Sequence, residues 1–489
     1  MPVIINSGTL RPLSYFWGSR RIMKILLFVF HFCTLLGGSI FAQNVLPDFF
    51  KLHQEYQEPS ITTKKFKLQD IEGLMLRFRE DKRFEIKPVG NSFLGKPIYL
   101  IRIGTGNKKV LLWSQMHGDE STATMALLDI FNYLKRSGKE NGITANLLEE
   151  CSLYFLPMLN PDGAELFVRR NAQQIDINRD ALWLQSPEAR LLKSIRDSLQ
   201  PDFGFNLHDQ SKYYTAGDLK RPASISLLAP AYNVEKDINA VRARAMLLIA
   251  KMQLALQSVI PNGVGRYDDE FEPRAFGDNI QKWGTSTILI ETGAYDNDPE
   301  KQFLRKVNFG AILICLQAIA DNSYYQNNIS DYWSIPENKN RLNDLVVRNV
   351  ALTLNEKEYR SDISLNIAET NGKAYIADMG DLSVFKGYKE WDGTGKKMVA
   401  GKTYPVLLKN HKRLYKVNQV ELLRQGYTEI RLEESPPADI RESNLLQILG
   451  PNENKNNSFM LGFNPNALIY ENGVVVAYLI NGNILPLKP

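Results

Sequence analysis

Two histidines and one glutamate stand at the ends of apolar runs. His117 and Glu120 come shortly after the run at 110–113, and His208 directly follows the run at 203–207. Two imidazoles and one carboxylate form the open ligand set of a catalytic zinc, which leaves the fourth position for water. A His-x-x-Glu pair by itself is more often a surface histidine. Beyond residue 42 the other histidines are His53 and His411, so the choice of ligands is narrow. The pattern predicts one Zn²⁺ per chain, held by His117, Glu120 and His208.

Four further motifs follow along the chain, and together with His-x-x-Glu they indicate a particular class of zinc enzyme. They are Asn160-Pro161-Asp162-Gly163, Arg169-Arg170-Asn171, Asp176-Ile177-Asn178-Arg179-Asp180 and, after the apolar run at 288–290, Glu291-Thr292-Gly293. With His-x-x-Glu before them, these motifs resemble those of the zinc carboxypeptidases, the funnelins related to pancreatic carboxypeptidases A and B. The resemblance covers about residues 60–325.

The resemblance implies a role for each matching residue. Glu291 would be the general base that takes a proton from water and passes it to the leaving amine. Asn178 and Arg179 would bind the terminal carboxylate of the substrate, for which a planar guanidinium is well suited. Arg169 would stabilise the oxyanion, with the adjacent Arg170 as the alternative.

The family also has a mobile tyrosine that covers the substrate. Tyr267, 24 residues before Glu291 (291 − 267), is the nearest candidate, and a plain surface tyrosine is the alternative. Asp180, Asp209-Gln210 and the acidic run at 268–272 depart from the pancreatic pattern. These departures leave the preferred terminal side chain undecided. Its pocket is expected within 276–283.

Alternating buried strands and helices must position these residues. Strands are expected at 84–86, 98–103, 110–113, 153–156, 203–207 and 287–290, and helices at 70–80, 122–134, 186–199, 234–257 and 305–320. The pattern predicts an α/β fold with a mixed, largely parallel sheet flanked by helices. In such sheets, sites form outside the carboxyl ends of the strands, where His117, His208 and Glu291 fall.

The pattern of predicted secondary structure changes after about residue 325. Short β-like runs follow, with hairpin signals at Asn472-Gly473 and Asn481-Gly482. We therefore expect five segments in chain order: 1–42, a signal peptide; 43–65, a lead-in; 66–325, the catalytic domain; 326–345, a linker; and 346–489, a smaller β-rich accessory region.

The N-terminus has the pattern of a secretory signal. Arg20, Arg21 and Lys24 precede an apolar stretch at 25–36 and the small residue Ala42, with Met23 as an alternative start. The apolar stretch is short for a membrane span. We expect a secreted or periplasmic protein with no stable membrane span after signal removal, and an uncleaved anchor is the alternative.

Charge and cysteine content give no support to a nucleic-acid-binding protein or to a disulfide-built scaffold. The net charge is +5, and residues 1–42 carry four basic and no acidic residues, which leaves +1 for residues 43–489. The basic balance is therefore no argument for a nucleic-acid partner. Cys151 and Cys315 lie beside apolar residues, so free, buried thiols are expected rather than a disulfide scaffold, although a bridge between them is the alternative.

Together, the residues and the resemblance imply a secreted or periplasmic zinc metallocarboxypeptidase. It would hydrolyse C-terminal peptide bonds in peptides or peptidoglycan peptides. Alternatives are a cell-wall peptide hydrolase of the same family, a zinc deacylase of the aspartoacylase type and a binding protein that retains the fold.

Overall fold

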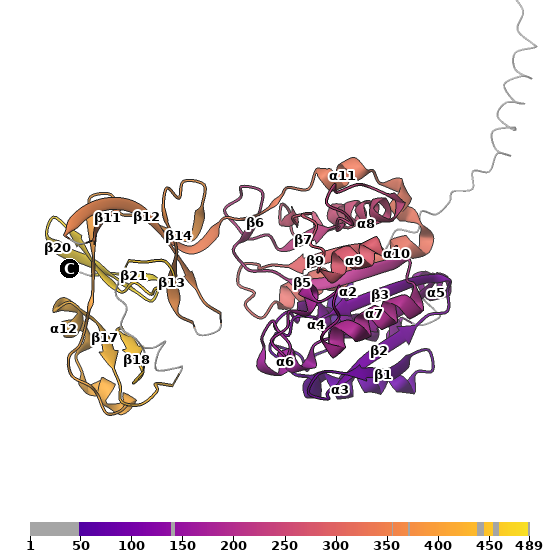
Figure 1. The fold of residues 1–489 in the computed structure, drawn as a ribbon, viewed down its shortest axis with the longest axis horizontal. Coiled ribbons are helices and arrows are strands. Elements are labelled where there is room, and N and C mark those ends of the chain that lie inside the picture. The colour runs from indigo at the N-terminus through magenta and orange to yellow at the C-terminus, as the bar shows by residue number, and fades with distance from the viewer. Residues whose placement is uncertain are drawn as a thin grey trace, which may run out of the picture. The chain divides into compact units, whose positions relative to one another are not determined.

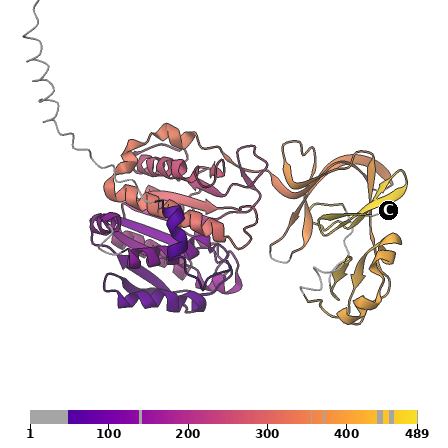
Figure 2. The ribbon, with the colours of Figure 1, turned by 180° about the vertical axis from the view of Figure 1, so that it is seen from behind.

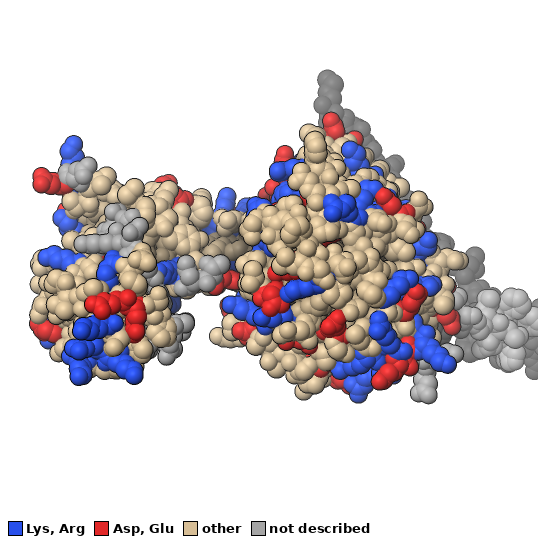
Figure 3. Space-filling model, turned by 60° about the horizontal axis from the view of Figure 1, so that its bottom comes forward, with Lys and Arg blue, Asp and Glu red and all other residues tan. Residues whose placement is uncertain are grey.

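The computed structural model describes residues 48–137, 142–354, 356–369, 372–437, 445–452 and 459–487. The predicted signal peptide at 1–42 lies outside these residues. An α/β part precedes a β-rich part along the chain (Figure 1). Basic and acidic side chains lie close to one another on the face in Figure 3, as fits the nearly balanced charge of residues 43–489.

Within the described residues, the α/β part is built on an eight-stranded sheet. In spatial order its strands are β1 (Glu85–Asn91), β2 (Pro97–Ile103), β4 (Cys151–Leu156), β3 (Lys108–Ser114), β5 (Phe203–Asp209), β9 (Ser286–Thr292), β7 (Ile225–Leu228) and β8 (Val264–Arg266). The central strands β4, β3, β5 and β9 run parallel, and antiparallel pairs flank them. This confirms the predicted fold class.

Buried apolar runs explain why the centre is parallel. All six residues of β4 are buried, and the run in β3 is buried from Val110 onward. Strands covered on both faces by helices are apolar throughout rather than alternating. The helices of this part are α2 (Phe49–Tyr56), α3 (Leu68–Leu76), α4 (Thr122–Arg136), α5 (Gly142–Glu150), α6 (Pro161–Leu166), α7 (Pro187–Leu199), α8 (Ala240–Leu256), α9 (Phe276–Lys282), α10 (Gln302–Asp321) and α11 (Ile329–Trp333). Short 3₁₀ turns occur at η1 (Arg77–Glu80), η2 (Ile177–Arg179) and η3 (Ser323–Gln326).

The helices form two layers, one on each face of the sheet (Figure 1 and Figure 2). The larger core contains side chains of α2, α4, α8 and α10, and the smaller core contains side chains of α7 and α9. In the described chain, α10 is the one helix long and apolar enough to pass as a membrane span, and 89% of its apolar window is buried. Cys151 and Cys315 are free and buried, as predicted.

The Asn-Pro-Asp-Gly motif shapes the loop that carries His117. The side chain of Asn160 caps α6 by accepting from the backbone N–H of Gly163 at 2.9 Å, and its amide donates to Met116 O at 3.2 Å. A Cβ at Gly118 would lie 2.0 Å from the backbone of Gly163, so the two loops can meet only with glycine there. The motif therefore holds the His117 loop against α6.

The C-terminal part is a β-structure with two apolar cores. Among the described residues, its larger sheet has the order β13 (Ala374–Gly380), β12 (Lys357–Ile367), β11 (Leu342–Leu354), β15 (Lys396–Ala400), β19 (Ala467–Glu471), β20 (Val474–Ile480) and β21 (Asn483–Pro486), with β14 (Lys386–Asp392) also paired to β11. A smaller sheet contains β16 (Lys402–Thr403), β17 (Tyr427–Arg431) and β18 (Gln447–Leu449), near α12 (Gln419–Arg424) and η4 (His411–Lys416). Asn472 and Asn481 adopt positive φ at the two predicted hairpin turns.

Two segments contain structure that the sequence analysis did not predict. The lead-in contains α2, whose Phe49 and Phe50 belong to the larger core. His53 Nε2 lies 2.8 Å from Asp129 Oδ2 in α4, and the same carboxylate accepts from Arg305 of α10. The expected linker contains α11 and a short strand, β10 (Asn338–Asn340), which pairs with β6 (Tyr214–Ala216).

Candidate functional site

Neighbouring strand ends bring the predicted ligands and base together. His208 and Glu291 are direct partners in the parallel ladder between β5 and β9, so their side chains leave adjacent strands at the same level. His117 follows the end of β3, beside β5. Just before it, Gln115 takes a left-handed backbone conformation with φ of 50°. The bend turns the chain over the carboxyl end of the sheet.

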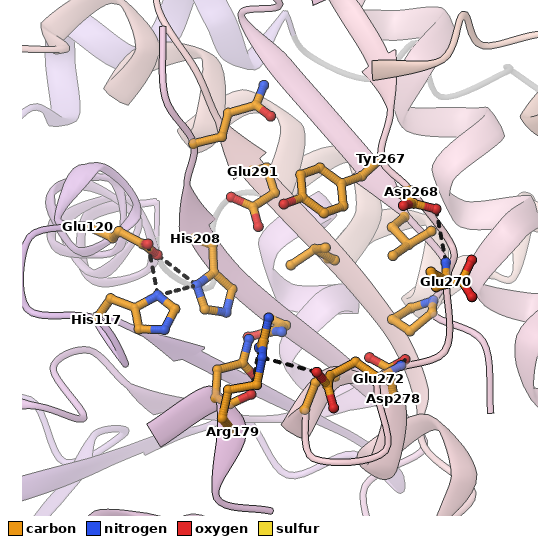
Figure 4. Close-up of a pocket in the computed structure, with 18 of the residues that line it drawn as sticks. His117, Glu120, Arg179, His208, Tyr267, Asp268, Glu270, Glu272, Asp278 and Glu291 are labelled. Atoms are coloured by element: carbon orange, nitrogen blue, oxygen red, sulfur yellow. Dashed lines mark hydrogen bonds and ion pairs between the residues drawn. The ribbon is translucent and has the colours of Figure 1, made fainter. Parts of the chain in front are cut away.

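The atoms of His117, Glu120 and His208 converge on one point (Figure 4). Glu120 Oε1 lies 2.8 Å from His117 Nδ1, and Oε2 lies 2.7 Å from His208 Nδ1. The two Nδ1 atoms are 3.2 Å apart. In a tetrahedral zinc site, two nitrogen ligands lie about 3.3 Å from each other, given Zn–N distances of roughly 2.0–2.1 Å. The donor set and its spacing therefore fit Zn²⁺.

Opposing electrostatic effects act on the three side chains. Burial lowers the pKa of His117, but Glu120 and Asp176 outweigh it and raise that pKa to about 9. Burial lowers the pKa of His208. The pKa of Glu120 lies well below its usual value because the two imidazoles outweigh the effect of burial. Glu120 is thus a carboxylate at neutral pH, as a metal ligand must be.

Asp176 contacts both His117 and Arg169 through its carboxylate. Its Oδ1 lies 3.0 Å from His117 Nε2, and its Oδ2 accepts from Arg169 Nε at 3.1 Å and Nη2 at 3.0 Å. Such a carboxylate fixes the orientation and basicity of a metal-binding histidine. Among the described residues, the corresponding Nε2 of His208 is buried without a hydrogen-bond partner.

The two adjacent arginines point in different directions. Arg169 Nη1 also donates to Glu120 Oε1 at 3.2 Å, and Arg169 lines the pocket. Arg170 is exposed and donates to Gln174 O at 2.8 Å; it is not among the described pocket-lining residues. The structure therefore brings Arg169, rather than Arg170, to the candidate metal ligands.

A pocket of about 510 Å³ opens beside the three candidate ligands. Glu291, Asn178, Arg179 and Tyr267 all line it. Arg179 Nε lies 3.3 Å from a carboxylate oxygen of Glu272. In Figure 4 the hydroxyl of Tyr267 points toward the Glu291 carboxylate.

Negative charges and burial raise the pKa values of several acidic groups in this pocket. Burial, with Glu120 nearby, raises the pKa of Glu291 well above its usual value. The charge of Glu291, together with burial, also raises the pKa of Tyr267. Asp278, buried in the first turn of α9, has its pKa raised by burial to about 7. A carboxyl group whose pKa is raised can both accept and return a proton, which suits acid–base chemistry, and Glu291 lies beside the candidate ligands.

Comparison with known proteins supports the interpretation of this site. Residues 75–204 match the family model described as zinc carboxypeptidase. This part of the chain is therefore similar to the zinc carboxypeptidase family. The match includes His117, Glu120, Arg169, Asn178 and Arg179 and ends before His208.

Curated relatives of the family align over short segments. Carboxypeptidase SOL1 of Arabidopsis thaliana is 29% identical over 119 residues, which are 23% of this chain and 24% of that protein. Carboxypeptidase 2 of Trichophyton rubrum is 29% identical over 153 residues, 30% of this chain and 27% of that protein. The gamma-D-glutamyl-L-diamino acid endopeptidase 1 of Lysinibacillus sphaericus is 33% identical over 86 residues, 17% of this chain and 22% of that protein. The alignments thus span about a quarter of the length of these three relatives.

Solved structures with similar folds include metallo-carboxypeptidases. One from Burkholderia cenocepacia has a TM-score of 0.43 at 17% identity, covering 53% of this chain and 70% of that chain. One from Pseudomonas aeruginosa, in complex with (2-guanidinoethylmercapto)succinic acid, has a TM-score of 0.43 at 20% identity, with the same coverage of 53% and 70%.

Some pocket residues were not assigned from the sequence. Asp176 lies two residues before the Asn178-Arg179 pair, and a carboxylate at this position is the sequence signal for its role. Tyr214 and Asn206 also line the pocket. Asn206 lies two residues before His208 on the same strand, so strand alternation could have placed it on the same face. Tyr214 had no sequence signal.

Proposed function

We propose that the protein is a zinc metallocarboxypeptidase that hydrolyses C-terminal peptide bonds. One observation carries the proposal. The candidate zinc ligands, the candidate base Glu291 and two guanidinium groups, those of Arg169 and Arg179, all line one pocket. The match of residues 75–204 to the zinc carboxypeptidase family model supports the same reaction.

His117, Glu120 and His208 would hold Zn²⁺ and leave its fourth position open. When bound there, Zn²⁺ lowers the pKa of water and polarises a carbonyl group. The role of the protein is to place the groups that move protons and bind charge around that position.

Glu291 would take the proton of the attacking water and pass it to the leaving amine. Its raised pKa makes a protonated state accessible during the reaction, as a base that later acts as an acid requires. Arg169, held by Asp176 and Glu120, would face the negative charge that develops on the carbonyl oxygen.

Arg179 and Asn178 would bind the terminal carboxylate. The Arg179 side chain is 38% exposed within the pocket and is paired to Glu272, so an incoming carboxylate would exchange with or share that pairing. Asn178 is oriented because its Oδ1 accepts from the backbone N–H of Phe276 at 2.9 Å. Tyr267 would lie over the bound residue, close to Glu291.

The predicted signal supports a secreted or periplasmic location, where peptides or peptidoglycan peptides would be the substrates. A cell-wall substrate has one specific observation in its favour. One of the curated relatives is the gamma-D-glutamyl-L-diamino acid endopeptidase 1 of Lysinibacillus sphaericus.

The test is to incubate the zinc-loaded protein with a mixed peptide library and with muropeptides, then follow the products by mass spectrometry. The proposal expects chelator-sensitive loss of single C-terminal residues from one of these pools. Glu291→Gln is the matched control, since it should bind zinc and release almost no product. Cleavage of acylated amino acids alone would favour the deacylase alternative. A protein that binds zinc yet cleaves none of these would refute a hydrolase of this class.

A further inference from the structure

The segment that follows His208 forms one wall of the pocket and is held by a later part of the chain. We call residues 210–217 the wall segment and residues 337–344 the anchor segment. Strand β6 of the wall segment pairs with β10 of the anchor segment in antiparallel fashion. The N–H of Gly217 donates to Glu337 O at 2.8 Å, and that of Leu342 donates to Tyr213 O at 3.0 Å. Backbone hydrogen bonds thus join the two segments along their length.

Asp344 anchors two consecutive side chains of the wall segment. Its Oδ1 lies 2.5 Å from Lys212 Nζ, and its Oδ2 accepts from the hydroxyl of Tyr213 at 2.6 Å and from the N–H of Ile367 at 2.8 Å. The Asp344 side chain is 15% exposed. Hydrogen bonds to an ionised carboxylate are stronger than neutral ones, and more so when solvent is largely excluded. Asp344 lies in β11 and Ile367 in β12, so the anchor belongs to the C-terminal sheet.

Asn338 makes a second anchor closer to His208. Its Nδ2 donates to Gln210 Oε1 at 2.7 Å, and its Oδ1 accepts from Ser226 Oγ at 2.9 Å. Gln210 Nε2 in turn donates to Ser226 Oγ at 2.8 Å. Gln210 and Ser226 are both buried. The side-chain amide of Asn338 therefore holds the wall segment through Gln210 and strand β7 through Ser226.

The wall segment held by these two anchors faces the pocket. Gln210 and Tyr214 both line it, and the rings of Tyr214 and Tyr267 lie 6.3 Å apart, centre to centre. Burial and the charge of Glu291 raise the pKa of Tyr214, so this tyrosine lies near the candidate base. A shift of the wall segment would therefore move a ring that abuts the candidate substrate-covering tyrosine.

We propose that Asp344 and Asn338 are positioning residues, through which the C-terminal region fixes the substrate-facing wall of the pocket. The inference rests on the proposed function and adds a role for a region outside the family match. The candidate metal ligands come from β5 and the His117 loop, and none of them contacts the anchor segment among the described residues. Loss of the anchor should thus weaken substrate binding and leave zinc bound.

The test compares Asp344→Ala with Asp362→Ala in the full, zinc-loaded chain. Asp362 is a matched control in the same sheet, because its carboxylate also accepts from a backbone N–H (Asn349, 2.8 Å) and pairs with a cation (Arg348, 3.2 Å) at similar exposure. Asp344→Ala should raise KM about tenfold, as expected for loss of a charged hydrogen bond, with a smaller change in kcat. Asp362→Ala should leave KM unchanged, and both variants should bind one zinc.

Two further measurements keep the outcome decisive. Hydrogen exchange of peptides covering 210–217 should accelerate in Asp344→Ala and not in Asp362→Ala. Tyr213→Phe, which removes one hydroxyl, should show the same direction of change if Asp344→Ala fails to fold. Equal KM values in the Asp344 and Asp362 variants, or loss of zinc with the KM change, would overturn the inference alone. Absence of cleavage by the unmodified chain would overturn the proposed function and this inference with it.

Discussion

Replacing Asp176 by asparagine should weaken zinc binding without removing a ligand. Asp176 Oδ1 lies 3.0 Å from His117 Nε2 and accepts from the backbone N–H of Asn178, while Oδ2 accepts from Arg169. Asparagine keeps the size of the side chain but loses its charge. The substitution therefore isolates the electrostatic support of His117.

The expected size of the effect follows from that contact. Asp176 is one of the groups that raise the pKa of His117 to about 9, so its loss should lower the basicity of the imidazole. Loss of a carboxylate behind a metal-binding histidine typically costs about 10–100-fold in metal affinity, or roughly 1.4–2.7 kcal/mol. The difference between the two proteins should shrink as pH falls, because protons compete with the metal more strongly for the more basic His117 of the unmodified protein.

Competition with a chromophoric chelator at fixed pH measures this change. Asp197→Asn is the control, since Asp197 is 45% exposed on α7, pairs with Lys193 and loses the same charge away from the site. Asp176→Asn should bind zinc more weakly than both the unmodified protein and this control. An affinity within about twofold of the control would refute the assigned role of Asp176.

Three further outcomes are expected. Glu291→Gln should keep its zinc and lower kcat by about 10²–10⁴, the usual share of a general base, and normal turnover would exclude Glu291 from that role. Asp278, whose folded pKa burial raises from 3.8 to about 7, holds a proton that the unfolded chain releases, so the free energy of unfolding should fall by up to roughly 4 kcal/mol as pH rises between those values. Urea titrations at pH 5 and pH 8 should show a smaller change in the free energy of unfolding for Asp278→Asn than for the unmodified protein. An equal change in the two proteins would contradict the buried carboxyl. Asp129→Ala leaves the fully buried Arg305 without its carboxylate and should cost about 3–5 kcal/mol, so an unchanged urea midpoint would contradict the ion pair.

The central sheet could be predicted because its strands contain nearly continuous apolar runs. Val110 to Trp113 and Phe203 to Leu207 are buried, and apart from Asn206 they carry no polar side chain, because helices cover both faces of the sheet. The helix α2 was missed because it is only eight residues long, which is too short for a helical spacing of apolar residues to stand out in the sequence. Phe49, Phe50 and Tyr56 become core residues only through contacts with α4 and α10, which the local sequence does not contain.

The identities of the candidate site residues could be predicted from the sequence, but their positions relative to one another could not. The motifs placed His208 and Glu291 at strand ends, whereas their direct pairing depends on the neighbouring positions of β5 and β9. The choice between Arg169 and Arg170 depended on which guanidinium meets Asp176. The contacts of Gln210 with Asn338 join residues 128 positions apart, and no local pattern indicates such a pair.

The burial of α2 limits how the chain could be shortened during maturation. Phe49 and Phe50 fill the core beneath α10, and a Cβ at Gly310 would lie 2.4 Å from the Phe50 ring. A processing enzyme that cut within α2 would expose this apolar surface and remove His53 from the charged cluster around Asp129. Proteolytic trimming that preserves the fold is therefore confined to residues before Phe49, and a mature chain should begin upstream of that position.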